Sequence, residues 1–117
     1  MEYMLLIYDS EAAAKKRSAA ELGQIHQDYM TFTMDLVRAG KNKGGNPLEQ
    51  TTTASTVRVR NGKTMVTDGP FAETKEQLGG YYLVEARDLD EAISIAARIP
   101  GAKFGSIEVR PVMKIPM

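Results

Sequence analysis

Residues 67–82 read TDGPFAETKEQLGGYY, a charged turn between two segments with the residue pattern of β-strands. The turn contains an aspartate, a proline, an aromatic residue and further charges, where a plain connection needs only a short Gly/Asn turn. Gly79 and Gly80 then lead into residues 81–86, which are typical of a strand. The stretch therefore predicts two strands joined by an unusually charged connection, which is the first candidate for a functional site.

The segment before this turn has the pattern of a β-hairpin. Two valines alternate with polar residues, and the pair Asn61-Gly62 favours a type I′ turn. This turn fixes the register and sets Val57 opposite Val66. Because side chains alternate along a strand, Asp68 is predicted to share a face with these valines and to point inward.

Apolar periodicity predicts the remaining elements. Ser18 and Glu21 have the spacing of a capping box, and apolar residues then recur at helical spacing up to Gly40. Residues 44–47, which read GGNP, are predicted to form a loop. The other predicted elements are a strand over 3–8, a helix that starts at 88–91 and ends before Pro100, and a strand over about 106–112.

This order of elements predicts an α+β fold, a ferredoxin-like βαββαβ sandwich with an elaborated central hairpin. Two helices cover only one face of such a sheet. The strand over 3–8 is apolar on both faces, so its second face is predicted to pack against another copy of the chain in a homodimer. The length of 117 residues fits a single domain over 1–117.

The composition excludes several classes of protein. Fifteen basic residues balance fifteen acidic ones, so no direct nucleic-acid partner is predicted. Cysteine is absent, which removes disulfides, thiolate ligands and a cysteine nucleophile. A single histidine with scattered carboxylates predicts no metal site, and no phosphate-binding loop indicates a nucleotide cofactor. The apolar run at 3–8 is too short for a signal peptide or a membrane span, which predicts a cytoplasmic protein that does not bind membranes.

The run from Asp68 to Phe71 resembles the DGPF motif of the YCII-related proteins. The similarity covers nearly the whole chain, and the other segments that carry it are residues 3–8, 56–60, 90–92 and 108–112. The resemblance implies one YCII-related domain with the fold and the homodimeric assembly of the dimeric α+β barrels. It does not specify a substrate.

Asp68 leads the candidate catalytic residues, because an inward carboxylate at a strand end either finds hydrogen-bond donors or has a perturbed ionisation. The alternative is that it only braces the turn that follows. Gly69, Pro70 and Phe71 are candidate ligand-binding residues next to it, although turn and packing roles also account for these residue types. Lys75 joins them only if it faces Asp68, since a short run of mixed charge is usually solvated.

Two residues of the first predicted helix are candidate proton donors. His26 is the only histidine, and histidine is the side chain that titrates near neutral pH. The resemblance implies that some family members pair a helix histidine with a nearby aspartate, but the expected position of that histidine is closer to Tyr29. Tyr29 offers a phenolic hydroxyl, with core packing as its structural alternative. Arg58 and Arg110 are candidates to bind a carboxylate, or to cross a dimer interface.

Two hypotheses about function follow. In the first, the protein binds a small organic molecule in a cleft between the first helix and the charged turn, and acts on it by acid–base chemistry. Asp68 would act as the base or orient the reacting groups, His26 or Tyr29 would be the proton donor, and an arginine would hold an anionic group. In the second, the domain is a non-catalytic regulatory or protein-interaction module, because domains similar to this one also occur beside sigma-factor-like transcription regulators.

Overall fold

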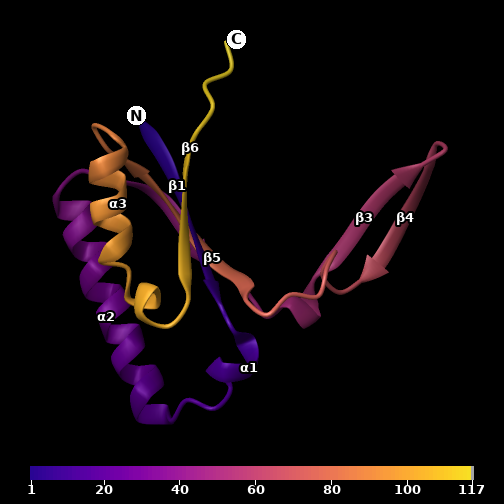
Figure 1. Ribbon diagram of the computed structural model, residues 1–117, viewed down its shortest axis with the longest axis horizontal. Coiled ribbons are helices and arrows are strands. Elements are labelled where there is room, and N and C mark those ends of the chain that lie inside the picture. Colours follow the sequence, from indigo (N-terminus) through magenta and orange to yellow (C-terminus); the bar gives the residue numbers. More distant parts are fainter. Residues whose placement is uncertain (117) are drawn as a thin grey trace.

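The computed structural model describes residues 1–116 and contains a four-stranded antiparallel sheet in the order β2-β5-β1-β6 (Figure 1). Its strands are β1 (Glu2–Asp9), β2 (Asn42–Pro47), β5 (Gln77–Glu85) and β6 (Ser106–Pro111). The first and third strands of this unit lie side by side in the middle of the sheet, as in a ferredoxin-like unit. The predicted α+β class and ferredoxin-like arrangement are therefore confirmed.

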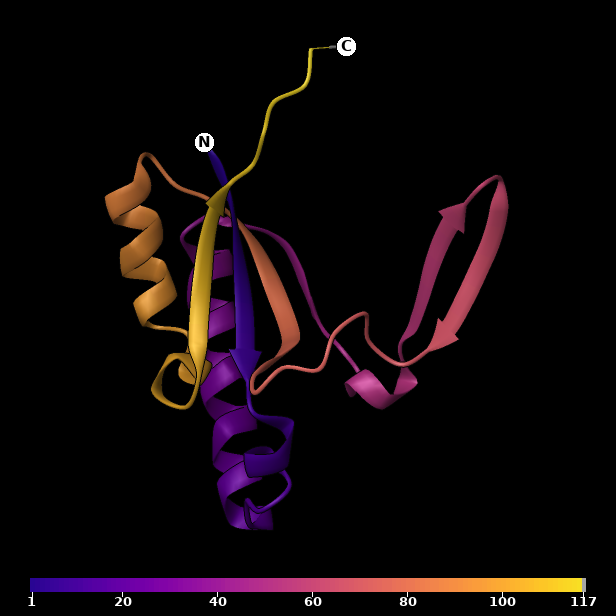
Figure 2. The same ribbon diagram turned by 45° about the vertical axis from the view of Figure 1, so that its right-hand side comes forward.

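Two helices, α2 (Ala19–Arg38) and α3 (Leu89–Ala97), cover one face of the sheet (Figures 1 and 2). The predicted capping box starts α2: Ser18 Oγ accepts from the Glu21 N–H at 3.1 Å, and the Glu21 carboxylate accepts from the Ser18 N–H at 3.3 Å. Among residues 1–116, no helix is long and apolar enough to cross a membrane. Three shorter elements are α1 (Glu11–Ala14), η1 (Thr51–Thr53) and η2 (Pro100–Lys103).

The core lies between the helices and the sheet. Alternate residues of β1, namely Tyr3, Leu5 and Ile7, face the helices and are buried, while those between them are only half-buried on the open face. In α2, Phe32 and Leu36 are buried in the same core. The other core residues are Val84, Ala86, Ala92, Ile95, Ala96 and Ile99. The first half of α2 contributes no buried residue, which leaves space beneath it.

The prediction of a loop over 44–47 is wrong, because these residues belong to β2, an edge strand paired with β5. Glycine and proline are depleted in strands, so the sequence gives no local strand signal here. The strand forms because β5 supplies the hydrogen-bond partners, and an edge position tolerates Pro47. The second strand of the ferredoxin-like unit is therefore β2, and the hairpin is an insertion between β2 and β5.

That insertion is a separate two-stranded sheet, β3 (Ser55–Arg60) and β4 (Lys63–Asp68), which projects from the body on the side opposite the helices (Figures 1 and 2). The predicted register is confirmed, with Val57 opposite Val66. Asn61 and Gly62 have φ values of 53° and 74°, as a type I′ turn requires.

The expectation that Asp68 points inward needs correction. The register does place its side chain on the face of Val57 and Val66, as predicted. That face is uncovered by any part of the described chain, however, and Asp68 is exposed along with both valines. The predicted face of Asp68 was right and its predicted burial was wrong, because the hairpin is not part of the main sheet.

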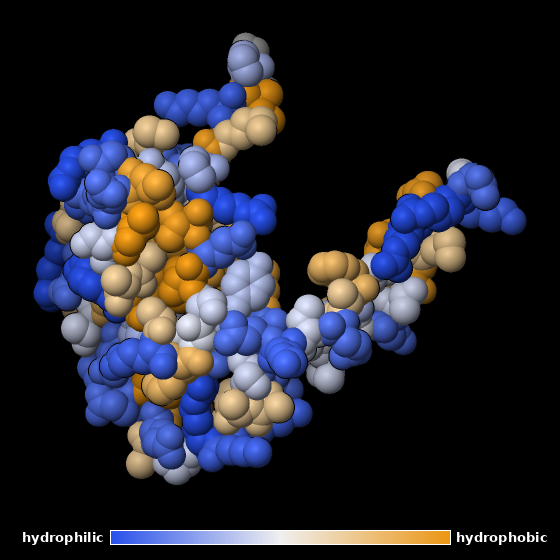
Figure 3. Space-filling view, viewed as in Figure 1, coloured by the Kyte–Doolittle hydropathy of each residue, from blue (hydrophilic) through white to orange (hydrophobic). Residues whose placement is uncertain are grey.

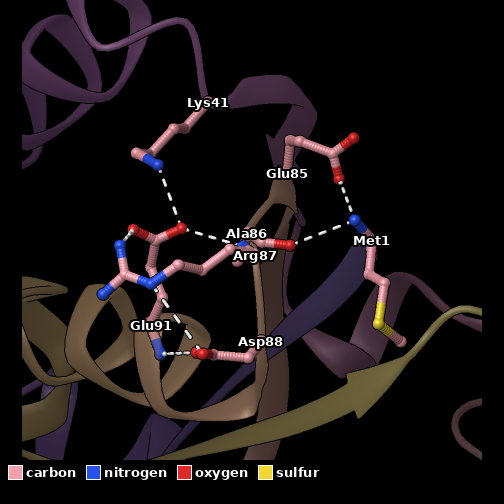
Figure 4. Close-up of polar contacts among 7 residues, drawn as sticks. All are labelled: Met1, Lys41, Glu85, Ala86, Arg87, Asp88 and Glu91. Atoms are coloured by element: carbon pink, nitrogen blue, oxygen red, sulfur yellow. Dashed lines mark hydrogen bonds and ion pairs between the residues drawn. The ribbon is translucent and has the colours of Figure 1, made fainter.

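A polar cluster ties the start of α3 to the sheet, and Glu91 is at its centre (Figure 4). Its carboxylate accepts from the backbone N–H of Arg87 at 2.9 Å and from Lys41 Nζ at 3.0 Å, and it pairs with the Arg87 guanidinium at 2.9 Å. The N–H of Arg87, followed by Lys41, lowers the pKa of Glu91 below its ordinary value.

We expect this cluster to make stability depend on pH in the acid range. A lowered pKa in the folded state means that the ionised Glu91 stabilises the fold above the ordinary glutamate pKa, and that this stabilisation is lost as the pH falls through the lowered value. Thermal melts between about pH 6 and about pH 3 should therefore show a smaller loss of melting temperature for Glu91→Gln than for the parent. Asp90→Asn changes an exposed neighbour and is the control. Equal slopes for the parent and Glu91→Gln would contradict the assignment.

Candidate functional site

A cleft of about 720 Å³ lies between α2 and the part of the sheet formed by β2 and β5. Small-molecule sites in proteins have volumes of roughly 300–1,000 Å³, so the size suits a compact ligand. Its walls are mainly apolar, and the apolar side chains that line it are Ile7, Leu22, Ile25, Met30, Met34 and Phe104. Leu22 is 49% exposed because it faces this open space.

Glycines explain why the space between helix and sheet is empty. Gly45 pairs with Tyr82 and Gly80 pairs with Ile7, on the helix-facing side of the sheet, so neither position projects a side chain toward α2. A Cβ on Gly45 would lie 2.6 Å from the carbonyl oxygen of Tyr81, which is closer than non-bonded atoms approach. Glycine is therefore required for this strand pairing, and the missing side chains create the cleft.

An ion pair lies at one end of the cleft. Asp9, the last residue of β1, accepts from Arg17 Nη1 at 2.9 Å and from the backbone N–H of Ser10 at 2.8 Å. The Arg17 guanidinium also lies over the Phe104 ring, 4.5 Å from its centroid. The Arg17 side chain is only 15% exposed, so the group is held in place by its neighbours. The Arg17 guanidinium has five N–H donors, and one of them is bound to Asp9. The others are suited to bind an anionic ligand oxygen.

Two candidate proton donors from α2 line the cleft. Tyr29 Oη accepts a hydrogen bond from the backbone N–H of Gly101 at 3.2 Å, so its own proton is directed elsewhere. Burial raises the pKa of Tyr29 above its ordinary value, so the hydroxyl, which is protonated at neutral pH in any case, is a weaker acid there and serves as a hydrogen-bond donor. His26 lies one helical turn before Tyr29 on the same side of α2, is exposed, and also lines the cleft.

Polar groups from the sheet complete the lining. The side-chain oxygen of Asn42 is buried and has no hydrogen-bond partner within residues 1–116. A buried acceptor without a partner costs free energy, which a ligand hydroxyl group would recover. Thr33 and Tyr82 are joined by a hydrogen bond of 2.6 Å across the cleft wall. The cleft thus offers a cation at Arg17, a donor at Tyr29 and an acceptor at Asn42.

Of the residues predicted from the sequence, His26 and Tyr29 line this cleft and the others do not. Gly69 and Pro70 lie at the base of the hairpin, where the Gly69 carbonyl accepts from the Thr56 hydroxyl at 2.9 Å. The remaining predicted residues are the exposed Arg58, Asp68, Phe71 and Lys75, and Arg110, which pairs with Glu108 on β6. Within the described chain, residues 68–75 of the charged turn do not line this cleft, whereas Gly79 to Tyr82 at the end of the same stretch do.

Sequence reasoning missed Asp9, Arg17 and Asn42. The sequence did contain a signal for Asp9, because a carboxylate directly after an apolar strand lies where the chain leaves the sheet. Arg17 immediately precedes the capping box and so lies at the entrance to α2. Asn42 could not be found, because no strand was predicted over 42–47 and residues 44–47 were predicted to form a loop. Within the described chain, no cluster of three or more histidine or carboxylate side chains is arranged to hold a metal ion.

Comparisons with known proteins agree with the fold. The model of the YCII-related domain family matches residues 1–116, which confirms the resemblance seen in the sequence. An uncharacterised protein of Rhizobium meliloti (strain 1021) is 41% identical over 114 residues, which span 96% of this chain and 92% of that protein.

One solved structure extends the comparison to a complex with a ligand. It is the 5-chloro-2-hydroxyhydroquinone dehydrochlorinase TftG from Burkholderia phenoliruptrix AC1100, in complex with 2,5-dihydroxybenzoquinone. Its TM-score is 0.56 at 17% identity, over 97% of this chain and 94% of that one. At this identity the likeness shows a shared fold.

Proposed function

The chain belongs to the YCII-related domain family, and we propose that its cleft binds a small, planar, hydroxylated organic molecule and acts on it by acid–base chemistry. The observation that carries the proposal is the convergence of Arg17, Tyr29 and Asn42 on one largely apolar cleft. Such a combination of apolar walls with a few polar groups is typical of small-molecule sites. The proposal keeps the acid–base chemistry expected from the sequence, and moves it from the charged turn to this cleft.

Each polar group has a role that its surroundings favour. Arg17, fixed by Asp9 and Phe104, would bind an ionised oxygen of the ligand. Tyr29, which stays protonated at neutral pH, would donate a hydrogen bond to a ligand oxygen or protonate it. His26 at the exposed side of the cleft would exchange protons with solvent.

The shape of the cleft supports a flat ligand. Gly45 and Gly80 expose backbone rather than side chains on the sheet side, and a planar ring can approach bare backbone closely. The dehydrochlorinase of similar fold is in complex with a hydroxylated quinone, a molecule of this class. We therefore take 2,5-dihydroxybenzoquinone as the first probe. The alternative function, a regulatory or protein-interaction module, stays a prediction.

Blocking the cleft should abolish binding. Met34→Trp adds a large ring to a cleft-lining residue of α2 that is 50% exposed, and we expect the affinity for 2,5-dihydroxybenzoquinone, measured by calorimetric titration, to fall at least about tenfold. The matched control is Val37→Trp, on the same helix, 56% exposed and outside the cleft lining. The proposal fails if the parent binds neither this probe nor any member of a panel of small hydroxylated rings, or if Met34→Trp binds as the control does.

A further inference from the structure

The segment that brings Arg17 to the cleft is not held in place by apolar packing. This segment, residues 10–17, is here called the α1 segment; it runs from the end of β1 toward the start of α2, and no residue of α1 is buried. Within residues 1–116, α1 has no extensive contact with any other helix or strand. A second cavity, of about 400 Å³, is lined by α1 and by residues 48–50. The position of the α1 segment therefore depends on polar contacts.

Glu11 makes three such contacts with parts of the chain far from it in sequence. Its carboxylate accepts from the Thr51 N–H at 2.8 Å and from the Thr51 hydroxyl at 2.7 Å. Its own backbone N–H donates to the side-chain oxygen of Gln77 at 2.8 Å. Thr51 begins η1, just before the hairpin β3–β4, and Gln77 begins β5 after it. Glu11 therefore joins the α1 segment to the chain that enters the hairpin and to the chain that leaves it.

These hydrogen bonds lie at the junction between the hairpin and the body. The hairpin joins the body through a narrow neck, at which mostly hydrophilic residues are in view (Figure 3). Hydrogen bonds to an ionised carboxylate are shorter and about twice as strong as those between neutral groups. Glu11, Thr51 and Gln77 are half-buried, so water competes with their contacts less than it does on an open surface. Glu11 is thus a firm link between the α1 segment and the neck.

A contact at the start of the α1 segment also constrains its end. The segment is short, and its backbone is closed by hydrogen bonds from the Lys15 N–H to the Glu11 carbonyl and from the Arg17 N–H to the Ala14 carbonyl, each of 3.1 Å. At its end, Arg17 Nη1 donates to Asp9, which lines both the cleft and the second cavity. If the Glu11 carboxylate lost Thr51, the segment could turn toward the second cavity and take the guanidinium with it.

We propose that Glu11 is a positioning residue for the cleft: by joining the α1 segment to the neck, it holds the Arg17 guanidinium in the orientation that binds an anionic ligand oxygen. The effect on binding rests on the proposed function, which assigns Arg17 to the ligand. Glu11 does not itself line the cleft, so it acts through Arg17. A change at the base of the hairpin, at Thr51, is thereby transmitted to the cleft.

The order of the Arg17 side chain tests this link without a ligand. In isotope-labelled protein, the nuclear magnetic resonance signal that disappears in Arg17→Met is the Arg17 Nε–H. We expect its order parameter to be near about 0.85 in the parent and to fall below about 0.6 in Glu11→Ala. Thr51→Val, which removes one of the two hydrogen bonds, should lower it less. Glu49→Ala removes the same charge from an exposed residue that lines the same second cavity, and should leave it unchanged. Equal order in Glu11→Ala and Glu49→Ala overturns the proposal.

Affinity for 2,5-dihydroxybenzoquinone tests the consequence for the cleft. Glu11→Ala should bind at least about threefold more weakly than Glu49→Ala. Glu11→Ala combined with Arg17→Met should bind as Arg17→Met does, because the guanidinium that Glu11 positions is already absent. An unchanged affinity in Glu11→Ala, or an equal loss with and without Arg17, overturns the positioning role. If the parent binds no hydroxylated ring, the proposed function fails, and the order of Arg17 alone decides whether Glu11 positions it.

Discussion

Gly105→Ala is expected to destabilise the protein more than any other single-methyl change. Gly105 lies between η2 and β6, and an added Cβ would overlap the carbonyl oxygen of Tyr8, with Asp9 Cα only 3.0 Å away. These are backbone atoms of β1, so they cannot rotate away as a side chain can. Overpacking of this kind costs about 3 kcal/mol, the upper part of its usual range. For a chain of 117 residues this lowers the melting temperature by about 12 °C.

The same substitution at Gly23 is the control, and it should raise the melting temperature instead of lowering it. Gly23 lies within α2, and an added Cβ would meet no atom within 4 Å. Alanine is favoured over glycine in a helix by about 0.5–1 kcal/mol, so Gly23→Ala should melt slightly higher than the parent. Both variants are melted at one protein concentration, so that any association between chains affects the two melts equally. Equal melting temperatures for the two variants would contradict the close approach at Gly105.

The parts of the fold that could be predicted are those encoded by neighbouring residues. Ser18 and Glu21 start α2 through contacts within one turn, and Asn61-Gly62 fixes the register of the hairpin. The failure at β2 has the opposite cause. Its glycines have no strand propensity, and the strand exists because β5 lies beside it, which is information from 30 or more residues away.

The same glycines explain why the cleft could not be placed from the sequence. Gly45 weakens the local strand signal and, once paired, leaves the helix-facing side of β2 bare. The feature that hid the strand is therefore also the one that opens the cleft. Tyr29 and His26 were found because helical spacing shows which side of α2 they share. Asp68 was expected to be buried because the sequence showed which face of the strand it lies on. The sequence did not show whether that face is covered by another part of the chain.

Arg17→Met should produce the largest loss of ligand affinity. Methionine keeps much of the aliphatic stem but removes the guanidinium that Asp9 and Phe104 hold in the cleft. Hydroxylated quinones are acidic, and a hydrogen bond between charged groups contributes about 1.5–3 kcal/mol, so affinity for 2,5-dihydroxybenzoquinone should fall by about 10- to 100-fold. Arg38→Met, at the exposed end of the same helix, should bind as the parent does.

A second variant separates contact with the ligand from support of Asp9. In Arg17→Met alone, Asp9 keeps its charge without its partner and repels an anionic ligand. Asp9→Asn combined with Arg17→Met removes that repulsion, so any affinity it restores measures the indirect effect. If Arg17 binds the ligand directly, the double variant stays at least about tenfold weaker than Asp9→Asn alone. Recovery of the double variant to the affinity of Asp9→Asn would reduce Arg17 to a partner of Asp9, and the anionic part of the ligand would then need another binding residue.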